Sequence, residues 1–209
     1  MIEIKETGGA RIGMANATWP FATLTVNKEM LQLNAAIIGN LVFKPGDIVS
    51  IEPYTTILSF GKGIKINHRV GNYNQKVIFW TMSNPAALID KIKQTGFLNN
   101  TNQINATLNK EITAAQAQGG FPIKIPLVIA IVVLWNIFFL VDFKNNATPG
   151  IGSQLALGFI LITCILLLTF EPVRRLILKE GRTIDSIRGF IFFLMIIIGF
   201  ILLMITISH

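Results

Sequence analysis

The sequence predicts an α+β unit, in which an antiparallel sheet or barrel of about seven strands is closed by one C-terminal helix, followed by three transmembrane α-helices. Three observations support this fold class. Short segments of two-residue periodicity fill residues 10–82, one amphipathic segment follows them, and three long apolar segments come last. We therefore expect a folded domain at 1–97, a polar linker at 98–121 and a membrane domain at 122–209.

The strand segments alternate apolar and polar residues. Leu31 and Leu33 share a face in KEMLQLN, and Leu41 and Phe43 share one in GNLVFKPGD. The segments WPFATLTVN, DIVSIEP, TTILSFGKG and VIFW are strand-like because they are rich in β-branched and aromatic residues. Gly, Pro and Asn between the segments indicate turns, so we expect an antiparallel sheet, barrel or sandwich.

The segment SNPAALIDKIKQTGF predicts a single amphipathic helix. Asn84 is placed to act as the N-cap, Pro85 occupies the first helical position, and Gly96 is placed to end the helix. Its apolar stripe consists of Leu88, Ile89 and Ile92. Such a helix needs an apolar surface to cover, and the preceding sheet provides one.

Residues 98–121 are polar, rich in Asn and end in Gly-Gly. Although ATLNKEITAAQAQ has the composition of a short helix, we expect the whole stretch to be a tether between the domain and the membrane.

Three apolar segments at about 125–143, 151–170 and 189–208 are each close to the roughly 20 residues that a spanning helix needs. The whole chain is 52% hydrophobic and only 14% charged, which is too apolar for an ordinary soluble domain. Asn136, near the middle of the first span, is expected to hydrogen-bond another helix. Asp142, near its end, is expected to be hydrated.

The loop charges predict the orientation. The second loop, EPVRRLILKEGRTIDSIR, carries five cations, whereas the first, DFKNNATPG, carries one. The positive-inside rule places the second loop and the N-terminal domain in the cytoplasm, and the C-terminus outside. We see no signal peptide and no cysteine in the N-terminal domain, which suits a cytoplasmic domain on a bacterial inner membrane.

Three phrases resemble a known family. KPGDIVSIEP, FGKGIKINHRVGNYNQKVIFWT and NPAALIDKIKQTGF resemble the second half of a pleckstrin-homology-like (PH-like or GRAM-like) domain of small bacterial membrane proteins. The resemblance covers about residues 10–97. It implies a PH-like sheet closed by one helix and an adaptor role, since some such domains bind phosphoinositides and many bind proteins or oligomerise. The early loops ATWPF and VNKEM offer only Lys28, which departs from the phosphoinositide pattern.

Two groups of cations are candidate lipid- or partner-binding residues. The first group is Lys62, Lys65 and Arg69 on a predicted strand, and the alternative, which we favour, is an ordinary solvated strand face. The second group belongs to an interfacial helix whose Val173, Leu176 and Ile177 would face lipid. Its cations, expected at the headgroups, are Arg174, Arg175 and Lys179. The alternative for this group is a plain topology signal.

Two further side chains are expected to be structural. His68 shares a strand face with Ile64 and Ile66, and it has no partner cluster, so we expect a local hydrogen bond. Phe79 and Trp80 point to opposite faces of their strand, one toward the core and the other toward the closing helix.

The sequence offers little chemistry. Cys164 is the single cysteine, there are two histidines, and no nucleophile, metal or phosphate-loop motif is present. We therefore expect no enzyme, no cofactor and no metal. The net charge of +7 is not gathered in a dense Lys/Arg stripe, so we expect no nucleic-acid partner.

The expected function is that of a non-catalytic integral membrane protein with a cytoplasmic PH-like interaction or scaffold module. Its partners would be the lipid bilayer and either another protein or further copies of the chain. One alternative is a membrane-surface lipid-binding or sensing protein that uses the basic strand 62–69. Another is an accessory subunit of a transport or secretion complex. A transporter itself is not expected, because the last two spans contain no ionisable residue besides Cys164.

Overall fold

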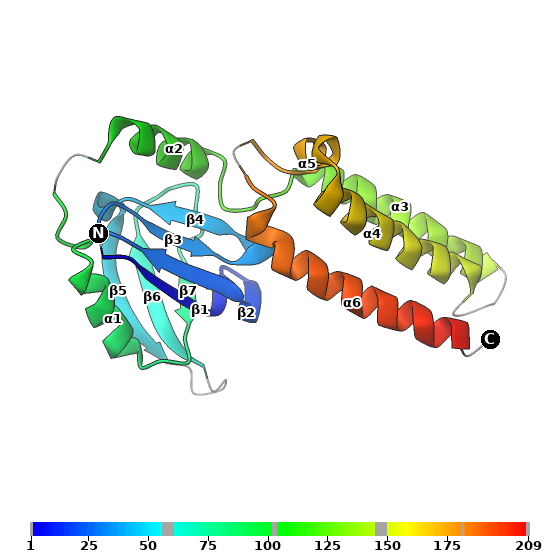
Figure 1. The fold of residues 1–209 in the computed structure, drawn as a ribbon, viewed down its shortest axis with the longest axis horizontal. Coiled ribbons are helices and arrows are strands. Elements are labelled where there is room, and N and C mark those ends of the chain that lie inside the picture. Colours follow the sequence, from blue (N-terminus) through cyan, green and yellow to red (C-terminus); the bar gives the residue numbers. More distant parts are fainter. Residues whose placement is uncertain (1, 56–60, 102–103, 145–149, 181, 208–209) are drawn as a thin grey trace. The chain divides into compact units, whose positions relative to one another are not determined.

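The chain divides into two compact units, Met1–Pro122 and Ile123–His209. The computed structural model describes residues 2–55, 61–101, 104–144, 150–180 and 182–207. Figure 1 shows a sheet unit built from the N-terminal part and a helical unit built from the C-terminal part. Each unit is treated below by itself.

Seven antiparallel strands form the sheet unit, in the order β4-β3-β2-β1-β7-β6-β5. The prediction of about seven antiparallel strands is confirmed, although the first strand, Ile4–Ile12, matches none of the predicted strand segments. Residues 56–60 of the predicted strand segment TTILSFGKG lie outside the described residues. The strands are β1 Ile4–Ile12, β2 Ala15–Val26, β3 Leu31–Asn34, β4 Asn40–Phe43, β5 Ile48–Thr55, β6 Lys62–His68 and β7 Val77–Trp80.

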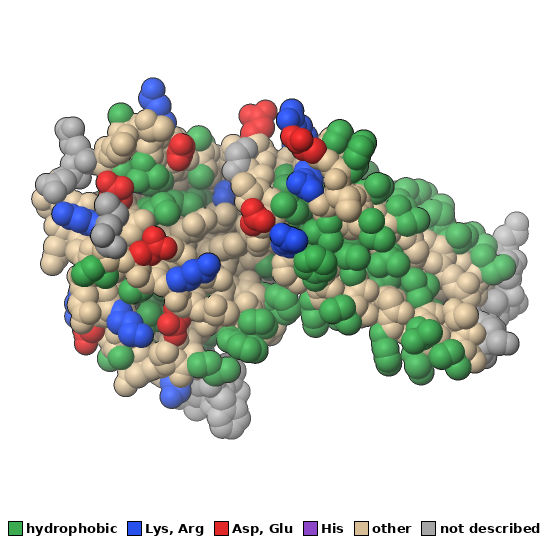
Figure 2. All heavy atoms as spheres, in the orientation of Figure 1, with side chains coloured by type: hydrophobic (Ala, Val, Ile, Leu, Met, Phe, Trp, Pro, Cys, Tyr) green, Lys and Arg blue, Asp and Glu red, His purple; other side chains and the backbone are tan. Residues whose placement is uncertain are grey.

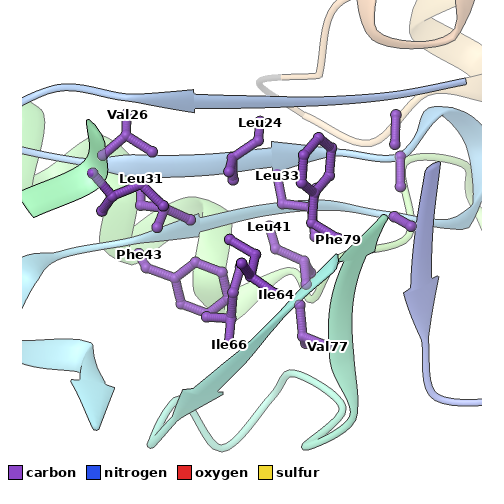
Figure 3. Packing of buried hydrophobic residues seen from close by; sticks show 14 of the residues in the cluster. Leu24, Val26, Leu31, Leu33, Leu41, Phe43, Ile64, Ile66, Val77 and Phe79 are labelled. Carbon is purple, nitrogen blue, oxygen red and sulfur yellow. The ribbon is translucent and has the colours of Figure 1, made fainter. Parts of the chain in front are cut away.

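The sheet curls around one apolar core (Figure 3). Alternating residues of neighbouring strands meet there, as the register pairs Leu24 with Leu33 and Ile64 with Phe79. All four of these side chains are fully buried. Burial of one such side chain contributes about 1.5–3 kcal/mol relative to its exposure, so this inner face holds the unit together.

Helix α1, Pro85–Gln94, closes the sheet as the sequence predicts. The Asn84 side chain accepts a hydrogen bond of 2.9 Å from the backbone nitrogen of Ala86, which confirms the N-cap. Gly96 follows the helix with φ +76°, the left-handed conformation that favours glycine. The stripe that joins the sheet's core consists of Leu88, Ile89 and Ile92.

Residues 98–121, expected to be a tether, contain helix α2, Ala106–Ala117, which packs beside β4. Ile112 is only 2% exposed. The Gln116 side-chain nitrogen donates a hydrogen bond of 3.0 Å to the carbonyl oxygen of Val42, on the open side of the edge strand. The polar composition of residues 98–121 did not predict that this helix packs on the sheet. The packing depends on one buried apolar side chain, Ile112, and one amide, Gln116.

The helical unit contains α3 Ile125–Lys144, α4 Ile151–Thr169, the short α5 Glu171–Ile177 and α6 Asp185–Ile207. Three of these helices are long and apolar enough to cross a membrane, over 125–142, 151–169 and 185–207. This agrees with the three predicted spans. The third helix begins four residues before the predicted 189, because a polar first turn precedes its apolar part. The predicted end at residue 208 lies outside the described residues.

Asp142 joins the first two of these helices and is 2% exposed, so the expectation that it is hydrated is wrong. Its carboxylate accepts hydrogen bonds from the backbone nitrogens of Gly152 (2.7 Å) and Ser153 (2.6 Å), and also from the Ser153 hydroxyl. A Cβ atom on Gly152 would overlap the carbonyl oxygen of Phe138, so glycine permits the close approach of α3 and α4.

The short helix α5 only partly matches the predicted interfacial helix. Leu176 is 60% exposed, as a lipid-facing residue would be, but Ile177 is 6% exposed and packs inside the helical unit. Pro172 in the first turn and the extended backbone of Leu178 keep this helix to seven residues.

Candidate functional site

The predicted basic strand is β6, and its two faces differ as expected. Ile64, Ile66 and His68 are buried, whereas Lys65 and Asn67 are half-buried on the opposite face. The alternation of the sequence therefore identified the inner and outer faces of this strand.

The outer face of β6 is not uniformly basic. Lys65 lies opposite Glu52 in the register of β5 and β6. The Asn67 amide nitrogen donates to the Ser50 hydroxyl at 2.8 Å and to the Glu52 carboxylate at 3.1 Å. Because an acidic side chain sits among the cations, Lys65 does not belong to a continuous cationic surface.

The other two predicted cations of this group lie apart from Lys65. Arg69 is exposed just beyond the end of β6, where its backbone nitrogen donates to the carbonyl of Asp47 at 3.0 Å. Lys62 begins β6 and lines a groove described below. Of the three residues, Lys62 lines the groove, Lys65 lies opposite Glu52, and Arg69 lies just beyond the end of the strand.

His68 holds the loop after its own strand. Its Nε2 atom lies 2.9 Å from the carbonyl oxygen of Asn74, and its Nδ1 atom accepts a hydrogen bond of 3.3 Å from the backbone nitrogen of Val70. Its ring centroid lies 5.1 Å from that of Phe43. These contacts agree with the expected structural role.

A bulge in β2 produces a feature that the sequence did not reveal. Gly8 pairs with Ala22, but Ala10 pairs with Ala17, so that Gly9 of β1 lies opposite the four residues 18–21 of β2. Such a bulge redirects side chains locally. The Trp19 side chain, which belongs to this bulge, is 57% exposed.

The bulge forms one wall of a groove of about 530 Å³ on the sheet unit. Trp19 and Trp80 supply aromatic surface, and the cations Arg11 and Lys62 also line it. The chain packs closely around Gly9, where a Cβ atom would lie 2.8 Å from the Ala17 carbonyl oxygen and 3.3 Å from the Trp80 ring. We call this feature the tryptophan groove.

Of the two aromatic residues expected on opposite faces of this strand, Phe79 is buried in the core and Trp80 lines the tryptophan groove. The Tyr54 ring supports it, with 5.7 Å between the ring centroids. Met82, at the end of the groove, is 74% exposed. None of the described residues that line the groove is acidic. The groove therefore suits an apolar or aromatic side chain that has negative charges beside it.

The predicted loop cations have three different environments. Arg174 donates to the carbonyl oxygens of Leu167 (2.9 Å) and Leu168, at the end of α4. Arg175 forms an exposed ion pair with Glu171 at 2.6 Å, and its hydrogen bond lowers the pKa of that carboxyl.

Lys179, the third loop cation, is half-buried. Burial lowers the pKa of its ammonium group, and the nearby charge of Arg182 lowers it further. The structure gathers Arg174, Arg175 and Lys179 around one hollow, together with Lys124 and Arg182, which the sequence analysis did not select. The sequence signal for Lys124 was its position immediately before the first span.

Asn136 forms its hydrogen bond within its own helix. Its amide nitrogen donates to the carbonyl oxygen of Val132 at 2.7 Å, and the side chain is exposed. A contact with a helix of another chain stays a prediction. Among the described residues, no group of three or more His, Cys, Asp or Glu side chains is placed to hold a metal ion.

Comparisons of the chain with known protein families, curated proteins and solved structures find no match. Function is therefore inferred from the geometry and chemistry of the sites themselves.

Proposed function

We propose that this protein is a non-catalytic, membrane-anchored interaction module that holds a segment of a partner protein in the tryptophan groove. The groove is the observation that carries the proposal. It combines two exposed or half-buried tryptophans with two cations, and aromatic and Arg residues are the groups that dominate protein interfaces.

The sheet unit is proposed to be a PH-like adaptor domain. Two features support this proposal: β1 pairs with both β2 and β7, so that the first and last strands are neighbours, and one helix follows the last strand. The three long apolar helices support anchoring in a membrane. The distribution of loop cations favours a cytoplasmic sheet unit on a bacterial inner membrane.

The groove's lining specifies the chemistry of the partner. Trp19 and Trp80 would contact one large apolar side chain, and Arg11 and Lys62 would attract carboxylates beside it. The proposed partner segment is therefore extended, with a Phe, Tyr or Leu flanked by Asp or Glu. Lys65 and Arg69 are not among the groove's described lining residues, and Glu52 lies opposite Lys65, which weighs against the alternative of a lipid-binding strand.

The test uses the full-length protein in nanodiscs and two labelled peptides that differ only in charge. One carries a single Phe among Asp and Glu residues, and the other has Lys in their place. We expect the acidic peptide to bind and the basic peptide not to bind. Trp19→Ala and Lys62→Glu should each weaken binding at least fivefold, as measured by fluorescence anisotropy.

Lys76→Glu is the matched control, because Lys76 is an exposed cation of the same unit that does not line the groove. Equal binding of both peptides, or no binding of either, would contradict the proposal. If the protein instead binds anionic vesicles through Lys62 and binds neither peptide, a lipid-binding role would replace the proposed peptide-binding role. Photo-crosslinking from position 82 in native membranes would then identify the natural partner.

A further inference from the structure

A second candidate site is a hollow of about 540 Å³ at one end of the helical unit. Residues at or next to the ends of all three candidate spans line it. Lys124 immediately precedes the first span, Glu171 comes two residues after the second, and Asp185 opens the third. Figure 2 shows acidic and basic side chains gathered there, whereas hydrophobic side chains are frequent on the rest of the visible face of the helical unit. The hollow therefore lies where spanning helices leave the hydrocarbon layer and meet lipid headgroups.

The charge around this hollow is positive. Its described lining contains five cationic and three acidic side chains. One of the acids, Glu171, is already engaged with Arg175 in an exposed ion pair. The cations are Lys124, Arg174, Arg175, Lys179 and Arg182.

Backbone contacts hold two of these cations in place. The Lys124 ammonium donates to the carbonyl oxygen of Arg175 at 2.8 Å, and its backbone nitrogen donates to that of Ile177 at 3.0 Å. Arg174 is held by the last carbonyls of α4. These cations are therefore fixed at the rim of the hollow instead of extending separately into solvent, which lowers the entropic cost of binding an anion.

Lys179 and Arg182 are crowded cations of like charge. Burial and the nearby charge of Arg182 both lower the pKa of Lys179, which shows that these two cations are neighbours at the hollow. One phosphate group could therefore contact both.

We propose that the hollow binds the phosphate of an anionic phospholipid headgroup, with Lys179 and Arg182 as the main contacts and Lys124 at the rim. A lipid is favoured over a soluble phosphate because three span ends flank the site, which puts it at headgroup depth. Basic pockets beside transmembrane helices recognise such headgroups through the same chemistry. This site uses other residues than the tryptophan groove and goes beyond the proposed function.

The test measures binding of short-chain lipids to the full-length protein in neutral detergent. The probes are dihexanoyl phosphatidylglycerol, dihexanoyl phosphatidylcholine and inorganic phosphate. We expect the phosphatidylglycerol to bind at least tenfold more tightly than either of the others. The double variant Lys179→Gln, Arg182→Gln should lose about 30-fold in affinity for it, since each cation near an anionic headgroup contributes about fivefold.

Arg188→Gln is the matched control, because Arg188 is a cation of the same end of α6 that contacts the Phe192 ring and does not line the hollow. Its affinity should stay within twofold of the wild type. The charge-preserving variant Lys179→Arg, Arg182→Lys should retain most binding, which separates loss of charge from loss of fold. Unchanged affinity of the Gln double variant would overturn the proposal. Equally tight binding of phosphatidylcholine or of inorganic phosphate would also overturn it.

Discussion

Asp142 links two helices of the largely apolar helical unit through its hydrogen bonds. The carboxylate, near the end of α3, accepts hydrogen bonds from the first backbone nitrogens of α4, which a helix otherwise leaves without partners. These donors replace water around a carboxylate that is almost fully buried. Asn136, in contrast, bonds only to a carbonyl of its own helix among the described residues.

Asp142→Ala is expected to lower the free energy of unfolding by about 1–2 kcal/mol, because the backbone nitrogens of Gly152 and Ser153 lose their acceptor. Asp142→Asn should cost less, since one acceptor oxygen remains. The measurement is thermal unfolding of the full-length protein in nanodiscs. Asn136→Ala serves as the control and should leave the midpoint unchanged. If the thermal midpoint of Asp142→Ala equals that of the wild type, the hydrogen bonds accepted by Asp142 contribute no stability.

Helix α2 protects one edge of the sheet by packing beside β4. β4 is a terminal strand in the sheet order, and an uncovered edge strand invites pairing with other chains. The Asn40 backbone nitrogen donates to the carbonyl of Gly120 at 2.8 Å, just after α2. The segment expected to be a tether therefore belongs to the folded sheet unit.

Ile112→Ala is expected to destabilise the docking of α2 by about 2–5 kcal/mol, the usual cost of truncating a buried isoleucine. Local opening should then speed amide hydrogen exchange in residues 40–43 and 106–117, and leave β6 unchanged. Hydrogen-exchange mass spectrometry of the full-length protein measures this. Glu111→Ala, on the exposed side of α2, is the control. Equal exchange in both variants would argue that residues 98–121 act as a tether after all.

For the whole molecule, the proposed topology places the sheet unit and the α4–α6 connection on the same side of a membrane. Four of the five predicted loop cations lie in that connection, and the positive-inside rule gives the direction. Because three helices are long enough to span, this topology predicts that the start of α4 lies toward the other side.

Membrane topology is tested with single cysteines in a Cys164→Ser background. Met14 is 94% exposed on the sheet unit, and Ile151 is 71% exposed at the start of α4. We expect an impermeant thiol reagent to label Ile151→Cys in intact cells, and to label Met14→Cys only after the membrane is opened. Labelling of both cysteines after opening provides the control. The reverse pattern in intact cells would invert the orientation.

Much of the fold could be predicted because its signals are local. Alternation in β6 separated Ile64 and Ile66 from Lys65, and the caps at Asn84 and Gly96 bounded α1. The sites could not be predicted in the same way. Trp19 and Trp80 lie far apart in the sequence, and they share a groove only because β1 pairs with both of their strands.

By itself, the sequence determined the antiparallel strand pattern, the closing helix and three membrane-length helices, because periodicity, capping and hydropathy are properties of neighbouring residues. Only the tertiary structure decided that α2 covers β4, that Asp142 is buried and that Lys124 joins Lys179 and Arg182 around one hollow. These outcomes depend on strand register and helix packing, which bring distant residues together through contacts that no local pattern encodes.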